Sequence, residues 1–92
     1  MLSETFKALA DPTRRDILKR LNDGDLAAGE IAAACDMSAP SVSHHLNVLK
    51  QAELVTSRRD GQSIIYALNS TVVQEFLQEL LDFFDVGEAD RA

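Results

Sequence analysis

The stretch SAPSVSHHLNVLKQA (residues 38–52), which continues into ELVTSRRDGQSIIYAL (residues 53–68), decides how this chain folds. In its first part Val42, Leu46 and Leu49 recur at the spacing of one helix face. This spacing predicts an amphipathic helix over residues 39–52, with these three side chains turned toward a core.

A second short helix is expected just before it, from Ala28 to about Cys35. Asp36-Met37-Ser38 then reads as a tight turn, and Ser38 can cap the following helix. Pro40 falls in the first turn of that helix, where a missing N–H does no harm. Two short helices joined by a tight turn predict a helix-turn-helix over residues 28–52.

Two β-rich runs follow, Leu54–Arg58 and Ser63–Leu68, joined by residues 59–62. The joining segment contains Asp60-Gly61, and Asp-Gly between two such runs is a strong hairpin signal. We therefore expect a hairpin, the wing of a winged helix, over residues 54–68.

Further helices are expected on both sides of this unit. Residues 1–10 have helical spacing, and Asp11-Pro12 is a start signal for a second helix that stops before Gly24. Residues 71–74 have the spacing of a capping box and open a last helix, which we expect within residues 70–86. The predicted fold is mainly α with a small β-hairpin: a single winged helix-turn-helix domain over residues 1–92, in the order ααααββα.

The last helix carries a wide apolar stripe, wider than a small domain needs for its own core. We expect the first and last helices, residues 1–10 and 70–86, to form a dimer interface, and residues 87–92 to form a flexible tail. The residues expected in the interface are Leu2, Phe6, Val73, Phe76, Leu77, Leu80 and Phe84.

The length of 92 residues and ordinary apolar content fit one globular domain. The net charge of −6 is unusual for a DNA-binding protein, but residues 64–92 hold six acids against one base and residues 1–20 hold five bases against three acids. The chain has one cysteine, no apolar run of bilayer length and no secretory signal at its start. We expect a cytoplasmic protein.

The side of the predicted 39–52 helix away from the core is short-chained and polar. A helix in the major groove reads bases with N-terminal residues of this kind, whereas Ser41 is better placed for a phosphate. The simpler alternative is a solvated face. His45 turns toward the flank of the core and is expected to pack there. For Lys50, contact with a phosphate and a plain surface position are equally good interpretations. The residues expected to face DNA on this helix are Pro40, Ser41, Ser43, His44 and Asn47.

Basic and polar side chains elsewhere complete the expected DNA surface. Arg58, Arg59 and Gln62 belong to the wing, where an arginine can neutralise a phosphate or enter the minor groove. Arg14 and Arg15, at the start of the second helix, can help in the same way. For these two, ion pairing with Asp11 or other nearby acids is an equally good interpretation.

Three motifs in this order resemble the ArsR/SmtB family of winged-helix repressors: DPTRR (residues 11–15), SVSHHL (41–46) and GQSIIY (61–66). Within it, residues 6–15 and 43–52 are most similar to the SdpR-like autorepressor branch. The resemblance implies a homodimer with two recognition helices and two wings on one face. It also implies that Ser43 and His44 contact bases, whereas Ala39 and Pro40 depart from the polar residues common in relatives.

Many members of that family release DNA on binding a metal. One family site uses a cysteine pair on the third helix, and the matching positions here are Gly29 and Ala32, which cannot ligate. The other uses Asp and His of the last helix, which here contains no histidine. Cys35 alone cannot make a tetrahedral site and reads as a core residue, so we expect neither metal nor cofactor.

Nothing in the sequence indicates an enzyme, because no nucleophile signature is present. The hypothesis is a sequence-specific homodimeric DNA-binding repressor acting on a palindromic operator, with control of its own operon as one form. The alternative is an effector-responsive regulator with a non-standard metal or thiol site, which bound metal or an effect of Cys35 oxidation would favour. A third is a winged helix used for protein binding; the presence of Ser43, Arg58 and Arg59 counts against it.

Overall fold

The computed structural model describes the backbone of residues 2–84 and the side chains of residues 3–84. The expected tail, residues 87–92, and the last two residues of the expected 70–86 helix lie outside this range. The elements within it are α1 (Leu2–Leu9), α2 (Pro12–Asn22), β1 (Leu26–Ala27), α3 (Ala28–Cys35), α4 (Ala39–Gln51), β2 (Val55–Asp60), β3 (Ser63–Leu68) and α5 (Ser70–Phe84). The predicted winged helix-turn-helix and its order of helices and hairpin are confirmed.

The core lies between α2, α3, α4 and the strands. α4 contributes the three side chains predicted from its spacing, Val42, Leu46 and Leu49, each at most 1% exposed. Each fully buried aliphatic side chain stabilises the fold by about 1.5–3 kcal/mol. These contacts fix which side of α4 is left facing outward. The other large buried side chains of this core are Ile17, Leu21, Ile31, Leu54 and Val55.

Side-chain caps begin α2 and α4 where the sequence predicted. The carboxylate of Asp11 accepts the N–H of Arg14 at 3.1 Å, and Pro12 follows it as the first residue of α2. Ser38 caps α4 in the same way, accepting the N–H of Ser41 at 3.3 Å. Both helices therefore begin at fixed residues.

α4 ends in a Schellman motif that has glutamate where glycine is usual. Glu53 adopts a positive φ of 62°, its N–H donates to the carbonyl of Lys50 at 2.9 Å, and the N–H of Leu54 donates to that of Leu49 at 3.0 Å. A left-handed conformation costs a residue with a Cβ about 1–2 kcal/mol. This strained turn directs the chain from α4 into the wing.

The sheet has three strands in the order β1-β3-β2, all antiparallel. Strand β1 was not predicted, because two residues are too few to show a pattern. It forms by pairing Leu26 with Tyr66 and Ala27 with Ile65. This pairing ties the segment before α3 to the base of the wing.

The wing turn is tighter than the predicted loop over residues 59–62. Asp60 still pairs with Ser63, so the turn consists of Gly61 and Gln62 alone. Gly61 has a φ of +64° in the first central position, where two-residue hairpins of type II′ prefer glycine. As a result Arg58 and Arg59 lie on strand β2 and alternate in direction.

α5 also begins earlier than its predicted capping box over residues 71–74. Its first residue is Ser70, and Asn69 precedes it. The side-chain oxygen of Asn69 accepts the N–H of Val72 at 3.4 Å, and its carbonyl accepts the N–H of Val73 at 3.0 Å. Asn69 is the better start signal because it directly follows β3.

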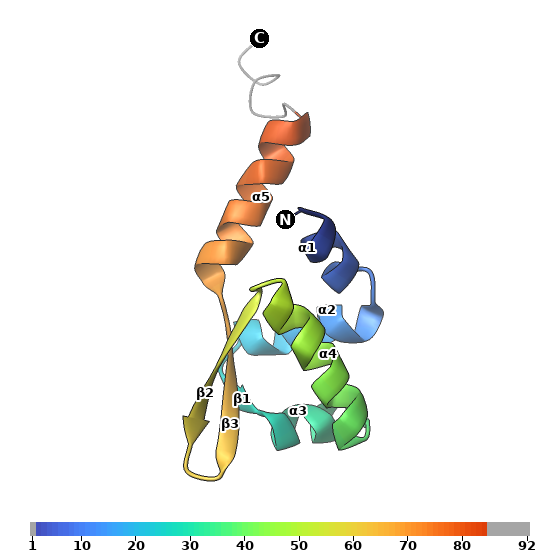
Figure 1. The fold of residues 1–92 in the computed structure, drawn as a ribbon, viewed down its shortest axis with the longest axis vertical. Coiled ribbons are helices and arrows are strands. Elements are labelled where there is room, and N and C mark those ends of the chain that lie inside the picture. Colours follow the sequence, from blue (N-terminus) through green and yellow to red (C-terminus); the bar gives the residue numbers. More distant parts are fainter. Residues whose placement is uncertain (1, 85–92) are drawn as a thin grey trace.

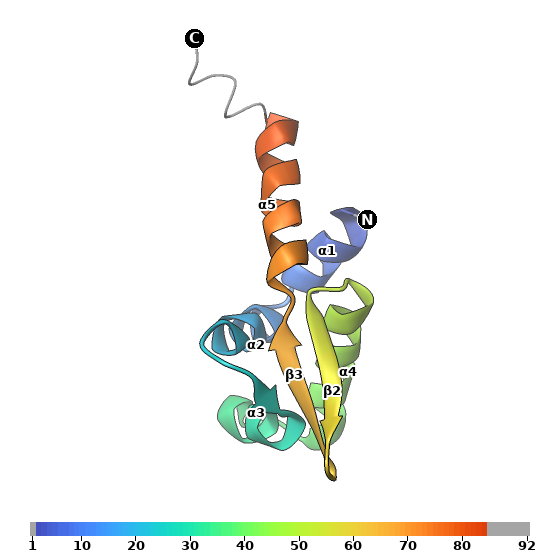
Figure 2. The same ribbon diagram turned by 90° about the vertical axis from the view of Figure 1, so that its left-hand side faces the viewer.

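The beginning of α4 and the wing turn lie at the opposite end of the molecule from α5. Figure 1 shows the beginning of α4 and the β2–β3 turn together at the bottom, whereas α5 projects from the top beside α1. The view turned by 90° shows the same separation (Figure 2), with α5 extending beyond the other elements. Among residues 2–84, no helix is both long and apolar enough to cross a membrane.

Candidate nucleic-acid interface

The outward side of α4 forms a polar surface at the lower end of the molecule. Because Val42, Leu46 and Leu49 are held in the core, the opposite side of α4 faces outward. Of those expected to contact DNA, Pro40, Ser43, His44 and Asn47 are exposed and Ser41 is half-buried. Four of these five are polar groups that can donate or accept hydrogen bonds at base edges.

The first turn of α4 carries a pair of hydroxyl groups. Ser38 Oγ donates to Ser41 Oγ at 3.0 Å, while the N–H of Ser41 donates to Ser38 Oγ. Helix N-termini favour anions because their first N–H groups lack partners within the helix. The two hydroxyls therefore stand where a phosphate would meet the helix dipole.

The wing presents two arginines in different states. Arg58 Nη1 lies 2.9 Å from Asp25 Oδ2, an exposed ion pair that the sequence did not predict. Arg59 is exposed and makes no ion pair with any described residue, and Gln62 is exposed at the turn. Arg59 is thus the wing cation that is free to meet a phosphate.

Arg14 and Arg15 both bind the end of α1. Arg14 Nε donates to the carbonyl of Ala8 at 2.8 Å and its Nη2 to that of Lys7 at 3.0 Å. Arg15 Nη1 donates to the carbonyl of Leu9 at 2.7 Å. In the protomer both guanidinium groups hold the carbonyl end of α1, and the charge of Arg14 also helps to lower the pKa of Asp11.

His45 is packed as predicted, with a side chain only 13% exposed. Its Nδ1 lies 3.2 Å from Arg14 Nη1 and 3.8 Å from Asp11 Oδ2. Arginine has no acceptor, so Nδ1 accepts this hydrogen bond. The backbone N–H of Arg14, which donates to the Asp11 carboxylate, is the main reason why the pKa of Asp11 lies below its ordinary value.

Cys35 lies at the end of α3 and is half-buried. Its Sγ is 3.8 Å from Asp16 Oδ2, and Asp16 in turn forms an ion pair with Arg20 at 2.9 Å. Burial raises the pKa of the Cys35 thiol, and the charge of Asp16 raises it further. A thiol of this kind stays protonated at neutral pH, whereas reactive cysteines have a lowered pKa.

The apolar stripe of α5 divides into a buried and an exposed part. Phe76 is only 8% exposed and packs edge-on against Phe6 with ring centroids 5.5 Å apart. Phe76 was expected in the dimer interface; within the protomer it already packs against α1 and leaves little surface for a second copy. Val73 is partly buried against the core, and Leu80 is half-buried.

Five large apolar side chains on α1 and α5 remain exposed. Phe6 is 50% exposed, Leu77 52%, Leu81 47%, Phe83 73% and Phe84 67%. Leu81 and Phe83 were not named among the expected interface residues, although their place in the apolar stripe could have indicated their exposure. Leu2 belongs to α1, but its side chain lies outside the described residues. We call these five residues the apolar face.

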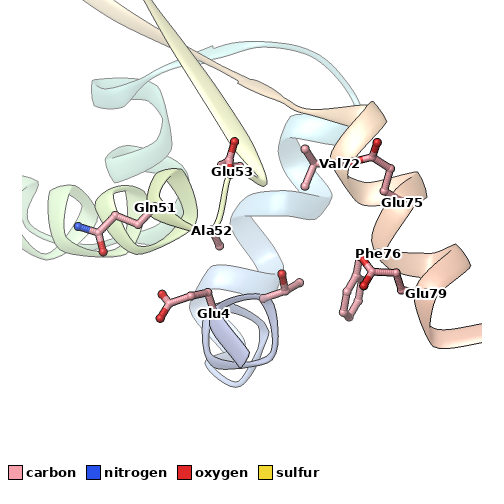
Figure 3. A pocket seen from close by; sticks show the side chains of 9 residues that line it. Glu4, Gln51, Ala52, Glu53, Val72, Glu75, Phe76 and Glu79 are labelled. Atoms are coloured by element: carbon pink, nitrogen blue, oxygen red, sulfur yellow. The ribbon is translucent and has the colours of Figure 1, made fainter. Parts of the chain in front are cut away.

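A cavity of about 360 Å³ lies between α1, the end of α4 and α5. Figure 3 shows four glutamates around it, with Ala52, Val72 and Phe76. Their charge would repel phosphates, so this region suits a place away from DNA. The four glutamates are Glu4, Glu53, Glu75 and Glu79.

The described residues do not fit either of the two metal sites that are common in the ArsR/SmtB family, which this chain resembles. Gly29 and Ala32 on α3 carry no ligating atoms, and α5 has no histidine between Ser70 and Phe84. Within the described part of the chain, no three histidine, cysteine or acidic side chains gather closely enough to hold a metal ion.

Comparison with known proteins gives a consistent result. Residues 11–57 match the family described as "Bacterial regulatory protein, arsR family". The transcriptional repressor SdpR of Bacillus subtilis (strain 168) is 49% identical over 89 residues, which cover 97% of this chain and 99% of SdpR.

Solved structures agree. An ArsR family transcriptional regulator superposes with a TM-score of 0.74 at 32% identity, covering 91% of this chain and 90% of that one. A homodimeric winged helix-turn-helix DNA-binding domain from Mycobacterium bovis gives a TM-score of 0.74 at 34% identity, covering 87% of this chain and 77% of that one.

Proposed function

Because the chain belongs to the arsR family of bacterial regulatory proteins, we propose that it is a sequence-specific repressor that binds a palindromic operator as a homodimer. The family consists of transcriptional regulators, so the chain is a DNA-binding regulator and not an enzyme. The observation that carries the proposal is the outward side of α4, which exposes Ser43 and His44. This helix begins at the same end of the molecule as the turn of the wing (Figure 1).

In this proposal α4 enters the major groove with its first turns leading. Ser43, His44 and Asn47 read base edges, because their exposed polar groups follow one side of the helix. Pro40 stands at the edge of this surface without a donor, and Ser41 meets a phosphate at the helix N-terminus. The hydrogen-bonded pair of Ser38 and Ser41 supports the latter role.

The wing contacts the backbone or the minor groove beside each half-site. Arg59 is the main cation there, because it is exposed and makes no ion pair with a described residue. Arg58 also contacts the DNA backbone once its ion pair with Asp25 is broken. Gln62 lies in the turn at the tip of the wing. Arg14 is left out of the DNA contacts, since three of its guanidinium N–H groups have partners within the protein, whereas the exposed Arg15 uses one at the end of α1 and stays a secondary candidate for a phosphate contact.

The homodimer forms through the apolar face. Five half- to mostly exposed apolar side chains gathered on two helices are what a dimer interface buries. The homodimeric relative from Mycobacterium bovis supports this assembly. A two-fold pair places two α4 helices on one side, which suits half-sites about one helical turn, roughly 34 Å, apart.

Control of its own operon is the form of regulation that the similarity to SdpR favours. The target implies action in the cytoplasm. No metal or other cofactor is part of the proposal, because the residues at the two family metal positions cannot ligate. The alternative, release of DNA by oxidation of Cys35, is disfavoured by its raised pKa.

Selection from a random-sequence duplex library tests the proposal. We expect enriched duplexes with two inverted half-sites about one turn apart, and footprinting should find such a site upstream of the protein's own gene. Enrichment of single half-sites would contradict the homodimer. Absence of any enrichment, with binding governed by salt alone, would contradict sequence-specific reading.

A further inference from the structure

Arg14 joins three helices through one guanidinium group. Its Nε and Nη2 donate to the last carbonyls of α1, at Ala8 and Lys7, and its Nη1 donates to His45 Nδ1 on α4 at 3.2 Å. Arg14 itself belongs to α2. A single planar side chain therefore spans the helix of the apolar face, the helix that follows it and the helix proposed to read DNA.

The α4 end of this link lies next to the proposed base-reading residue. The rings of His44 and His45 have centroids 5.7 Å apart and are tilted by 57°. Asp11 Oδ2 lies 3.8 Å from His45 Nδ1, too far for a hydrogen bond, so Arg14 supplies the hydrogen bond that orients this ring. The hydrogen bond from Arg14 on α2 thus limits the rotation of the His45 ring and ties α4 to α2 at this point.

Resting on the dimer of the proposed function, we propose that Arg14 and His45 are positioning residues that set the angle between α1 and α4. In a two-fold dimer built on α1 and α5, this angle determines how far apart the two α4 helices stand. The link therefore determines which half-site spacing the protein accepts. It does so without either residue touching DNA.

The geometry favours this role over a phosphate contact for Arg14. Three of its five N–H groups already have partners within the protein. A guanidinium fork fixes direction as well as distance, which a lysine ammonium cannot do. Arg15 provides the matched control: it also donates to a carbonyl at the end of α1, at 2.7 Å, but no hydrogen bond or ion pair recorded for it reaches α4.

The test compares affinity for a duplex selected by the wild-type protein with affinity for the same duplex lengthened by one central base pair. That insertion moves one half-site by about 3.4 Å and about 35°, and we expect the wild-type protein to lose about tenfold in affinity. We call the affinity for the selected duplex divided by that for the lengthened duplex the spacing ratio. Arg14→Gln and His45→Leu should reduce this ratio to about one third of its wild-type value or less, because α4 is no longer held at one angle. Arg15→Gln should keep the wild-type ratio.

A conservative substitution at His45 distinguishes a positioning role from a general loss of stability. His45→Asn keeps an acceptor near the position of Nδ1 and should restore the wild-type ratio, whereas His45→Leu should not. If Arg14→Gln fails to fold, the two His45 variants decide the question alone. The proposal would be overturned if Arg14→Gln and Arg15→Gln lost affinity equally on all duplexes, with a reduced salt slope and an unchanged affinity ratio between the two duplexes. Unchanged ratios in all variants would overturn it as well.

A second measurement needs no DNA. Spin labels at Lys50→Cys in a Cys35→Ser background report the distance between the two α4 helices of a dimer. We expect a narrow distribution for the otherwise unchanged protein and for Arg15→Gln, and a broader or shifted one for Arg14→Gln. Identical distributions would overturn the positioning role. Absence of any inter-label distance in the unchanged protein would instead overturn the dimer itself, and the positioning role with it.

Discussion

Replacing Leu81 by alanine should weaken the dimer strongly and leave the fold of each protomer intact. Leu81 is 47% exposed on α5, so about half of its surface is available for burial by a second copy. The substitution removes three carbons, worth about 0.8 kcal/mol each when fully buried. Half of that, counted once in each protomer, gives about 2.4 kcal/mol for the dimer, or about a fiftyfold increase in its dissociation constant.

Sedimentation equilibrium over a dilution series measures this constant directly. Gln78→Ala is the control, because Gln78 lies on the same helix, is exposed, and donates only to Asp82 on the polar side of α5. It should leave the dissociation constant unchanged. If both variants dimerise as the wild-type protein does, the apolar face is not the interface and the reasoning from exposed apolar area is refuted.

Three further outcomes follow from single features of the chain. Glu53→Gly should raise the free energy of unfolding by about 0.5–1 kcal/mol, since glycine adopts the positive φ at the end of α4 without strain, and a lower denaturation midpoint would contradict this. Asp11 has a lowered pKa, so its charge stabilises the fold above its ordinary pKa of 3.8, and that contribution is lost as the pH falls through the folded pKa. Asp11→Asn keeps the helix cap but does not titrate; urea unfolding should show its difference from the wild-type protein shrinking below about pH 4, and a constant difference would refute the coupling. Zn²⁺, Cd²⁺ or arsenite should not release the protein from DNA, and stoichiometric binding in calorimetry accompanied by release would prove otherwise.

The helices and hairpin could be predicted from the sequence because their signals are local. The spacing of Val42, Leu46 and Leu49 specifies the core side of α4, and this in turn specifies the outward side. Asp11 and Ser38 mark helix starts with their own side chains. Each of these features depends on residues a few positions apart.

The remaining features depend on contacts between distant segments. Strand β1 exists only because β3 pairs with it, and no two-residue pattern announces that. The acceptors of Arg14 and Arg15 are carbonyls, which every residue has, so only the position of the end of α1 reveals them. Phe76 and Leu77 are equivalent in the apolar pattern of the sequence, and only packing against other elements, including Phe6 of α1, buries Phe76 while Leu77 stays half exposed.

The central claim is that the outward side of α4 reads base sequence whereas the wing meets the backbone. The most direct test measures the affinity of Ser43→Ala, His44→Ala and Arg59→Ala for the selected duplex and for a scrambled one over a range of salt. Ser43→Ala and His44→Ala should each lose about 1–3 kcal/mol on the selected duplex and little on the scrambled one. Arg59→Ala should weaken both alike and reduce the salt slope by about one. Equal losses on both duplexes for Ser43→Ala and His44→Ala would contradict the claim and move sequence reading away from α4.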